Sequence, residues 1–185
     1  MTRVASFCLM SWLLIVFPTL SYADGYSTIG GGGGGESKAG NVSLELGGIS
    51  LLDGERKQLI AIGLGFIFGD DVPSDLLDYP VPHEDYTDLG KRQKGNEYGI
   101  FVKYGLELIE NNNLFIFGLG GCSFAEEVDL ARSNVTGWYY EQSSSTKTYG
   151  IFGVGFAYYF KENKKLLQIE YDNRRGITGS IGFFW

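Results

Sequence analysis

The sequence predicts an all-β fold, a closed antiparallel barrel of eight strands that spans a membrane once a signal peptide has been removed. Three observations predict this class. Seven segments alternate apolar residues with polar or small ones at a period of two, and the last of them ends the chain at Trp185. The chain begins with the features of a secretory signal. Two of the connections between segments are long and polar, and the others are short.

Residues 1–23 have the three parts of a cleaved signal peptide. Arg3 supplies the positive start, residues 9–17 the apolar core, and residues 21–23 a small-x-small cleavage site. A membrane-spanning anchor is the alternative, but the apolar run is shorter than the roughly 20 residues that a spanning helix needs. The mature chain is therefore expected to be one barrel domain over residues 24–185.

The composition of the mature chain disfavours several classes of partner and cofactor. The whole chain has 15 Lys and Arg against 22 Asp and Glu, so removing Arg3 leaves 14 against 22, a net charge of −8. An acidic chain without clustered bases is a poor partner for nucleic acid. Cys122 is the single cysteine left after cleavage, so neither an intramolecular disulfide nor a cysteine metal cluster is expected. No cofactor is expected.

The first strand, over residues 24–36, is assigned by topology. It contains six consecutive glycines, Gly30 to Gly35, which have no side chains to bury. A flexible linker is the local alternative. Because single-chain bacterial barrels have an even number of strands, the seven alternating segments require an eighth here.

The seven alternating segments are separated by turn residues. In the segment 57–68 a row of large apolar residues faces small ones such as Gly63 and Gly65, which is typical of the crowded interior of a narrow barrel. In the segment 41–52 the dipeptide Gly47-Gly48 shifts the phase, which predicts a bulge. The expected strands cover residues 41–52, 57–68, 97–109, 114–126, 148–160, 165–172 and 177–185.

Two long polar connections are expected, at residues 69–96 and 127–147. Three short turns are expected at residues 53–54, 111–113 and 161–164, and residues 173–176 turn into the final strand. In membrane barrels the short turns are periplasmic and the long loops are extracellular. A final strand that ends in the periplasm places all three short turns there and both long loops outside. Loop length thus supports the barrel independently of the alternation.

By this pattern the whole mature chain resembles the small Gram-negative outer-membrane barrels typified by OmpX and the transmembrane domain of OmpA. The C-terminal strand carries the resemblance most directly, with Ile181, Phe183 and Trp185 alternating up to the terminal carboxylate. The resemblance implies a bacterial outer-membrane location and a monomer in contact with outer-membrane lipid and lipopolysaccharide. It also implies that this strand is the signal by which the barrel assembly machinery recognises the chain.

The charged residues of the expected strands lie opposite the large apolar rows, so those rows are predicted to face lipid. A base at mid-depth on the lipid face costs about 2–4 kcal/mol, and this cost selects the phase. We predict that Lys103 pairs with an interior carboxylate and that Arg174 or Arg175 offsets the remaining acid. The alternative is that each group reaches solvent alone at the barrel mouth. The predicted interior network consists of Glu45, Lys103, Glu107, Gln168 and Glu170.

The expected long loops hold the candidates for external contacts: His83, Trp138, Tyr139 and Tyr140. Exposed aromatic residues make compact contact surfaces, although Trp138 to Tyr140 also suit a barrel rim. His83 resembles the loop histidine of the outer-membrane palmitoyltransferase that remodels lipid A. No serine matches that enzyme by motif, nor the deacylase that pairs histidine with a strand serine, so a solvated histidine is the alternative. The acidic residues of loop 69–96 lack EF-hand spacing, and no metal site is predicted.

The sequence therefore predicts a non-enzymatic outer-membrane barrel with acidic external loops and a structural or surface-interaction role. No catalytic residue is assigned. The alternatives are a lipid A-modifying enzyme and a narrow pore. Side chains fill the lumen of an eight-stranded barrel, which disfavours the pore.

Overall fold

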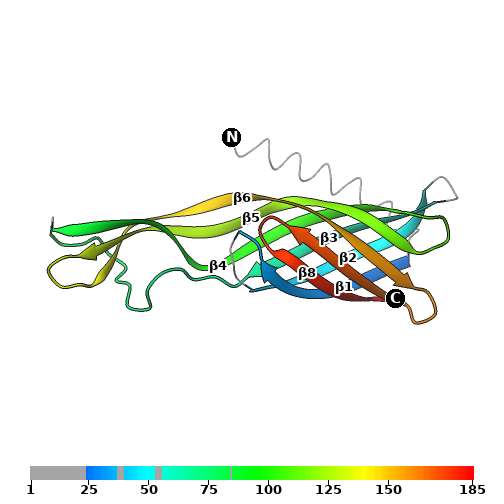
Figure 1. The fold of residues 1–185 in the computed structure, drawn as a ribbon, viewed down its shortest axis with the longest axis horizontal. Helices are drawn as coiled ribbons and strands as arrows, with labels where there is room; N and C mark the ends of the chain where they lie inside the picture. Colours follow the sequence, from blue (N-terminus) through cyan, green and yellow to red (C-terminus); the bar gives the residue numbers. More distant parts are fainter. Residues whose placement is uncertain (1–23, 37–39, 53–55, 84) are drawn as a thin grey trace.

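The computed structural model describes residues 24–36, 40–52, 56–83 and 85–185, which form a closed ring of eight antiparallel strands (Figure 1). Each strand pairs with its neighbours in the sequence, and β1 pairs with β8. The described residues contain no helix long and apolar enough to cross a membrane. The strands are β1 (Asp24–Gly34), β2 (Gly40–Leu52), β3 (Arg56–Ile67), β4 (Tyr86–Glu107), β5 (Leu114–Ser133), β6 (Tyr139–Phe160), β7 (Lys165–Asp172) and β8 (Gly176–Phe184).

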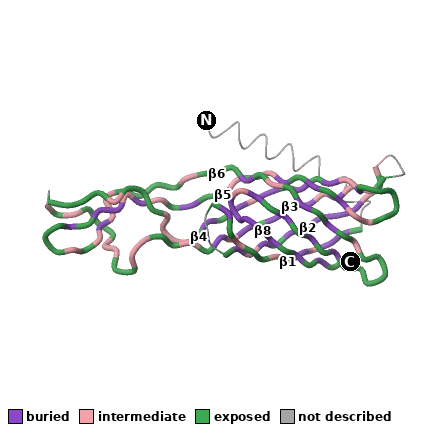
Figure 2. Tube along the Cα trace, in the orientation of Figure 1, coloured by how far each residue is buried: buried purple, intermediate pink, exposed green. Residues whose placement is uncertain are grey.

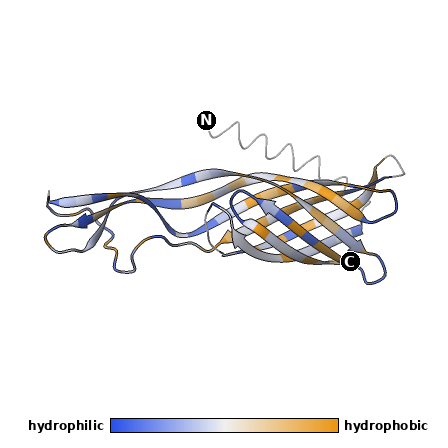
Figure 3. Ribbon diagram, in the orientation of Figure 1, coloured by the Kyte–Doolittle hydropathy of each residue, from blue (hydrophilic) through white to orange (hydrophobic). Residues whose placement is uncertain are grey.

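The outward face of the barrel is an apolar band. Large apolar side chains such as Val102, Phe156 and Ile169 are about half exposed there, while the residues between them are buried in the lumen (Figure 2). Hydrophobic residues gather on the barrel part of the molecule (Figure 3). A soluble protein does not expose so wide an apolar surface, whereas a transmembrane barrel requires one. The predicted phase, with charges inside, is observed on the strands that carry interior charges, β2, β4 and β7. On β5 the expectation that the large apolar row faces lipid is wrong, because Phe115, Phe117 and Leu119 are buried in the lumen and Ile116 is exposed.

Three strands continue far beyond the rest of the barrel. The last pair between β3 and β4 is Ile67 with Glu97, and the last pair between β6 and β7 is Gly153 with Asp172. Beyond these pairs β4, β5 and β6 form a three-stranded sheet that projects from one end (Figure 1). We call it the protruding sheet; it comprises residues 86–96, 124–133 and 139–152.

The protruding sheet corrects the prediction of two long loops. Residues 86–96, expected within loop 69–96, belong to β4, and most of loop 127–147 belongs to β5 and β6. The hairpin connection that remains is residues 134–138. The prediction failed because residues 86–96 and 139–147 are mostly polar on both faces, and on the β5 segment the alternation is limited to Val128 and Leu130.

The bulge expected at Gly47-Gly48 is also wrong. The register of β2 with β1 and β3 runs through both glycines without a shift. Register shifts occur instead in the protruding sheet and at its base, between Asp88 and Gly90, between Lys94 and Tyr98, and on β5 between Asp129 and Leu130. The expected signal peptide over residues 1–23 and the expected turn at residues 53–54 lie outside the described residues.

The first and last strands meet at a seam where glycine is required. A Cβ atom added to Gly32 of β1 would lie 1.8 Å from the backbone oxygen of Ile177 on β8. A Cβ atom on Gly30 lies 2.3 Å from the Ser180 hydroxyl. Gly30 and Gly32 are therefore packed too closely to their neighbours for side chains, and most of the glycine run is part of strand β1.

Candidate functional site

Lys103 lies at the centre of a polar layer in the lumen. Its Nζ atom is 2.5 Å from Oε1 of Glu45, donates to Oε1 of Gln168 at 2.9 Å, and also forms an ion pair with Glu170. The side chains of Lys103, Glu45 and Glu170 are fully buried. Because β2, β4 and β7 each contribute one charge, the network ties together strands that are distant in the sequence.

Two arginines of the turn between β7 and β8 extend this layer toward the protruding end. Arg175 donates from Nη2 to Glu170 at 2.7 Å and from Nε to Asp172 at 2.7 Å. Arg174 forms an ion pair with Glu97 at 2.5 Å. Buried ion pairs of this kind fix relative positions even where desolvation cancels much of their attraction.

Glu107 lies apart from the other predicted network members. It accepts hydrogen bonds from Nζ of Lys57 at 3.3 Å and from the backbone of Asn113 at 2.8 Å, near the short turns. The structure thus brings Glu45, Lys103, Gln168 and Glu170 together and gives Glu107 a partner of its own. Lys57, Glu97 and Asp172 were missed by the sequence analysis. The alternation of their strands places Glu97 and Asp172 on the inward face, so this part could have been predicted. Which residues they contact depends on the register of the barrel.

An apolar layer fills the lumen on the short-turn side of Lys103. Phe117 lies under Lys103, with Nζ 4.7 Å from the ring centroid. Behind it a cluster of buried residues includes Tyr26, Leu59, Phe115 and Leu166. Because this layer crosses the interior, the lumen has a packed core instead of a water-filled channel.

One connection crosses the face of the protruding sheet. Residues 68–83, here called the strap, lie between β3 and β4 in the sequence. At one end the backbone of Asp71 donates to Gln93 of β4, and further on Leu77 forms a parallel bridge beside Tyr140 of β6. The ring of Tyr79 packs edge-on against Tyr140 at 5.6 Å. The strap therefore spans the sheet from the edge of β4 to the edge of β6.

Lys94 fastens the strap to both outer strands. Its Nζ atom lies 2.8 Å from Oδ1 of Asp78 in the strap and 2.8 Å from Oε2 of Glu141 on β6. The hydrogen bonds to Asp78 and then to Glu141 raise the pKa of Lys94 above its ordinary value. A raised lysine pKa means that the contact is complete at neutral pH and is lost only as the pH rises through that pKa.

The structure places His83 beside a serine at the far tip of the protruding sheet. Nε2 of His83 is 2.9 Å from Oγ of Ser133, which also accepts hydrogen bonds from the backbone of Val135 and Thr136. Ser133 is only 1% exposed, so a substrate has no access to its hydroxyl. Asp85 does not orient the histidine: Nδ1 of His83 has no hydrogen-bond partner among the described residues, and Oδ1 of Asp85 accepts from Asn134 at 2.8 Å. This geometry anchors the strap to the tip and does not form an accessible nucleophile.

The three candidate aromatic residues have different environments. Trp138 is 56% exposed at the tip, Tyr139 is half-buried beneath Arg132, and Tyr140 is 3% exposed against the strap. Only Trp138 among them presents its side chain for contact. The tip that carries it is ordered by Arg132, whose Nε donates to the carbonyl of Gly137 at 3.2 Å.

The edge of β6 is open between two capped ends. Leu77 pairs with it at Tyr139 and Glu141, and Asn173 bonds to the backbone of Gly150 and Phe152. Between these contacts, residues 143–149 pair with β5 on one side, Gln142 is the extra residue at a register shift, and no described residue pairs with the other side of residues 142–149. An unpaired strand edge presents a row of free N–H and C=O groups that another strand can join.

The three residues of the predicted C-terminal signal lie at the seam and on the outward wall. Ile181 pairs with Ile29 and Leu167, and Phe183 pairs with Ser27 and Lys165. The backbone of Trp185 donates to Gly25 at 3.0 Å. These residues belong to the closure of the barrel.

Comparisons with known proteins agree with this fold. No protein-family model matches the chain, and no curated protein matches it. The chain is similar to the crystal structure of Ail, the attachment invasion locus protein of Yersinia pestis, with a TM-score of 0.52 and 12% identity over 88% of this chain and 98% of that one. For the backbone structure of Ail in a phospholipid bilayer nanodisc the TM-score is 0.47 and the identity 12%, over 88% and 99% of the two chains. At this identity the similarity shows the fold, that of small Gram-negative outer-membrane barrels.

Proposed function

We propose that the chain is a non-enzymatic outer-membrane barrel that binds an extended segment of a partner protein along the open edge of β6. The free edge at residues 142–149 carries the proposal. The barrel holds the three long strands at their base, and the strap, Lys94 and the His83–Ser133 contact hold them beyond it. A binding edge that is already ordered loses little entropy when a partner pairs with it.

The side chains of the edge suit strand addition. Residues 143–146 are small and polar, Ser143-Ser144-Ser145-Thr146, so they neither block an incoming backbone nor create an apolar aggregation surface. The outer wall of the barrel faces lipid, so the protruding sheet is the part of the molecule that reaches beyond the membrane. The role in attachment that the name of the Yersinia barrel states is consistent with such a surface.

The same geometry disfavours the two alternatives. An enzyme would need an accessible nucleophile, and Ser133 is buried and accepts two backbone hydrogen bonds. A pore would need an open lumen, and Phe115, Phe117 and Lys103 are among the side chains that fill it.

The proposal is tested with a proline that removes one edge-facing N–H. The backbone groups of Phe152 and Gly150 bond to Asn173, on the side of β6 away from β5. Because the backbone groups of successive residues point to alternate sides of a strand, the N–H and C=O groups of Thr148, Thr146 and Ser144 point to the same side, the open edge. In Thr146→Pro, a proline at an edge N–H leaves the pairing with β5 intact. Cells that display this variant should adhere much less than cells with the original protein to surfaces coated with extended polypeptide.

The matched control is Thr146→Val, which keeps the backbone N–H and a β-branched side chain. It should adhere like the original protein. Equal adhesion of all three proteins would contradict strand addition at this edge. Equal loss in both variants would show that the hydroxyl, and not the backbone, makes the contact.

A further inference from the structure

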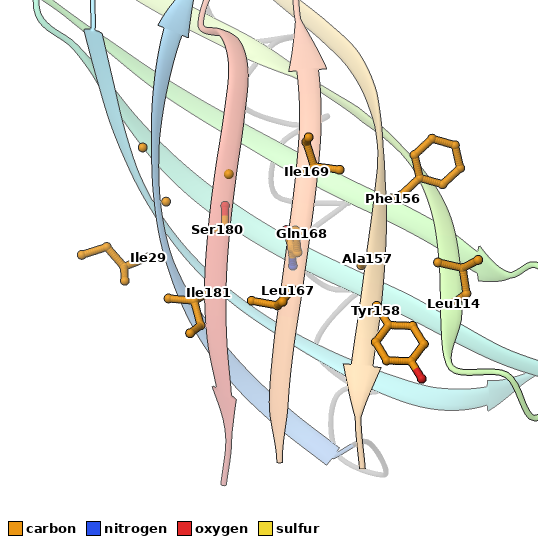
Figure 4. A pocket seen from close by; sticks show the side chains of 13 residues that line it. Ile29, Leu114, Phe156, Ala157, Tyr158, Leu167, Gln168, Ile169, Ser180 and Ile181 are labelled. Atoms are coloured by element: carbon orange, nitrogen blue, oxygen red, sulfur yellow. The ribbon is translucent and has the colours of Figure 1, made fainter. Parts of the chain in front are cut away.

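The lipid-facing wall of the barrel contains a groove over β1, β8, β7 and β6 (Figure 4). Its volume is about 830 Å³, within the roughly 300–1,000 Å³ range of ligand pockets. None of the residues that line it is charged. The side chains that form its walls are Ile29, Ile181, Leu167, Ile169, Phe156 and Tyr158.

Two glycines form the floor of the groove. Gly31 and Gly179 oppose each other across the seam, and a Cβ atom on Gly179 meets nothing within 4 Å. In the neighbouring row the equivalent pair is Ile29 with Ile181, which carries two large side chains. Atoms of the groove walls that face empty space lack dispersion contacts, so packing favours the binding of a molecule that fills the groove.

Three exposed lysines lie at the short-turn end of the groove. Lys165 lies two residues before Leu167 on the same outward face of β7, and Lys161 and Lys164 lie in the turn between β6 and β7. Glu162 is the one acid in that turn, so the cluster has a net positive charge. Among the described residues, none forms a salt bridge with these lysines. Lysines at this level attract anionic headgroups.

We propose that the groove binds one acyl chain of an anionic glycerophospholipid, with the lipid phosphate among Lys161, Lys164 and Lys165. The groove is open to the bilayer, so acyl chains of lipids lie beside it along the whole length of the groove. The short turns of outer-membrane barrels are periplasmic, so the lipid comes from the inner leaflet. The site does not depend on the protruding sheet, and its test is independent of the edge of β6.

The test is native mass spectrometry of the folded protein in detergent with phosphatidylglycerol, phosphatidylethanolamine or lipopolysaccharide added separately. We expect one retained phosphatidylglycerol. Gly179→Leu fills the floor and should lower its retained fraction at least five-fold. The matched control is Gly118→Leu, because Gly118 is also exposed with nothing within 4 Å of its Cβ position but does not line the groove. This control should retain the lipid.

The headgroup contact is tested by Lys161→Gln with Lys165→Gln, which should lower phosphatidylglycerol retention to the level of phosphatidylethanolamine. Heat-modifiable gel migration verifies folding, and Gly179→Ala replaces the leucine variant if the latter does not fold. The proposal is overturned by equal retention in Gly179→Leu and the original protein, or by equal loss in Gly118→Leu. Preferential retention of lipopolysaccharide, or a dimer that Gly179→Leu abolishes, would also overturn it by identifying a different occupant.

Discussion

The strands β4, β5 and β6 pass through two environments, and the two halves of each strand are held in place in different ways. In the barrel half of β5, lumen-facing Phe115 and Phe117 are buried while Ile116 between them is 43% exposed. In the protruding half, Val128 and Leu130 are buried among charged neighbours, and the strap crosses the sheet. The barrel half is thus stabilised by its position between lipid and lumen, and the protruding half by a connection folded over it.

One continuous strand therefore need not have one sequence pattern. In the membrane the cost of an exposed charge enforces strict alternation. In water both faces of a sheet tolerate polar residues, so order must come from pairing and from contacts such as Lys94 with Asp78 and Glu141. Variants in the barrel should therefore affect the whole molecule, and variants in the protruding sheet should leave the barrel intact.

The largest effect is expected at the seam that closes the barrel. Removing residues 183–185 deletes the pairing of Phe183 with Ser27 and the hydrogen bond from Trp185 to Gly25. It also removes the part of the C-terminal strand that is expected, from the resemblance to small outer-membrane barrels, to be the assembly signal. We expect no heat-modifiable species in the outer-membrane fraction. Normal insertion would show that these residues are dispensable for closure.

A smaller effect, but still on the whole barrel, is expected for Lys103→Met. It leaves the buried carboxylates of Glu45 and Glu170 close together without their shared cation. Breaking a buried pair in this way costs about 3–5 kcal/mol, measured as a loss of unfolding free energy in urea.

The double variant Lys103→Met with Glu45→Gln should recover part of that loss, because one of the uncompensated charges is removed. The control is Lys103→Met with Glu107→Gln, since Glu107 pairs with Lys57 instead. Recovery in the control, or strict additivity in the first pair, would contradict the observed partners.

A local effect is expected for Lys94→Met in the protruding sheet. The variant releases the strap from Asp78 and Glu141, and partly exposed ion pairs of this kind contribute about 1 kcal/mol or less. Chymotrypsin should cleave the strap near Leu76 to Tyr79 several times faster, while the unfolding of the barrel stays unchanged. A change in barrel stability would show that the two halves are coupled.

The smallest effect is expected for His83→Ala. It removes one contact with Ser133, of about 1 kcal/mol, at the tip. Mass spectrometry of lipid A from cells with and without the variant should give the same species. A difference in lipid A would restore the enzyme interpretation.

The barrel could be predicted from the sequence because the membrane imposes a local rule on each strand. What the lumen contains could not be predicted in the same way. Alternation does not reveal which row of β5 faces inward, and Phe117 fits there because Gly155 leaves room: a Cβ atom on Gly155 lies 2.5 Å from its ring. Likewise Gly63 makes room for Phe101. Such large-to-small matches join strands that are far apart in the sequence, so no single segment shows them.

The candidate site was predictable only in parts. Alternation predicted that Glu45, Lys103 and Glu170 point inward. It did not predict that Glu107 lies apart from Lys103, because this depends on the depth of Glu107 in the barrel, where Lys57 is its partner. At the tip, His83 was visible as the single histidine, whereas Ser133 is 50 residues away and reaches it only because β5 continues past the barrel. The missing information was strand length, which sets where distant residues meet.

The two capped ends of the β6 edge also set a length. Leu77 occupies one end and Asn173 the other, so a strand that joins the edge has space for residues 142–149 alone, about 26 Å at the usual strand rise of roughly 3.3 Å per residue. A shorter segment leaves backbone groups exposed to water, and a longer one meets the caps and must bend away. If a partner strand joins this edge as proposed, the length of its extended run, as well as its side chains, should decide which partner the protruding sheet accepts.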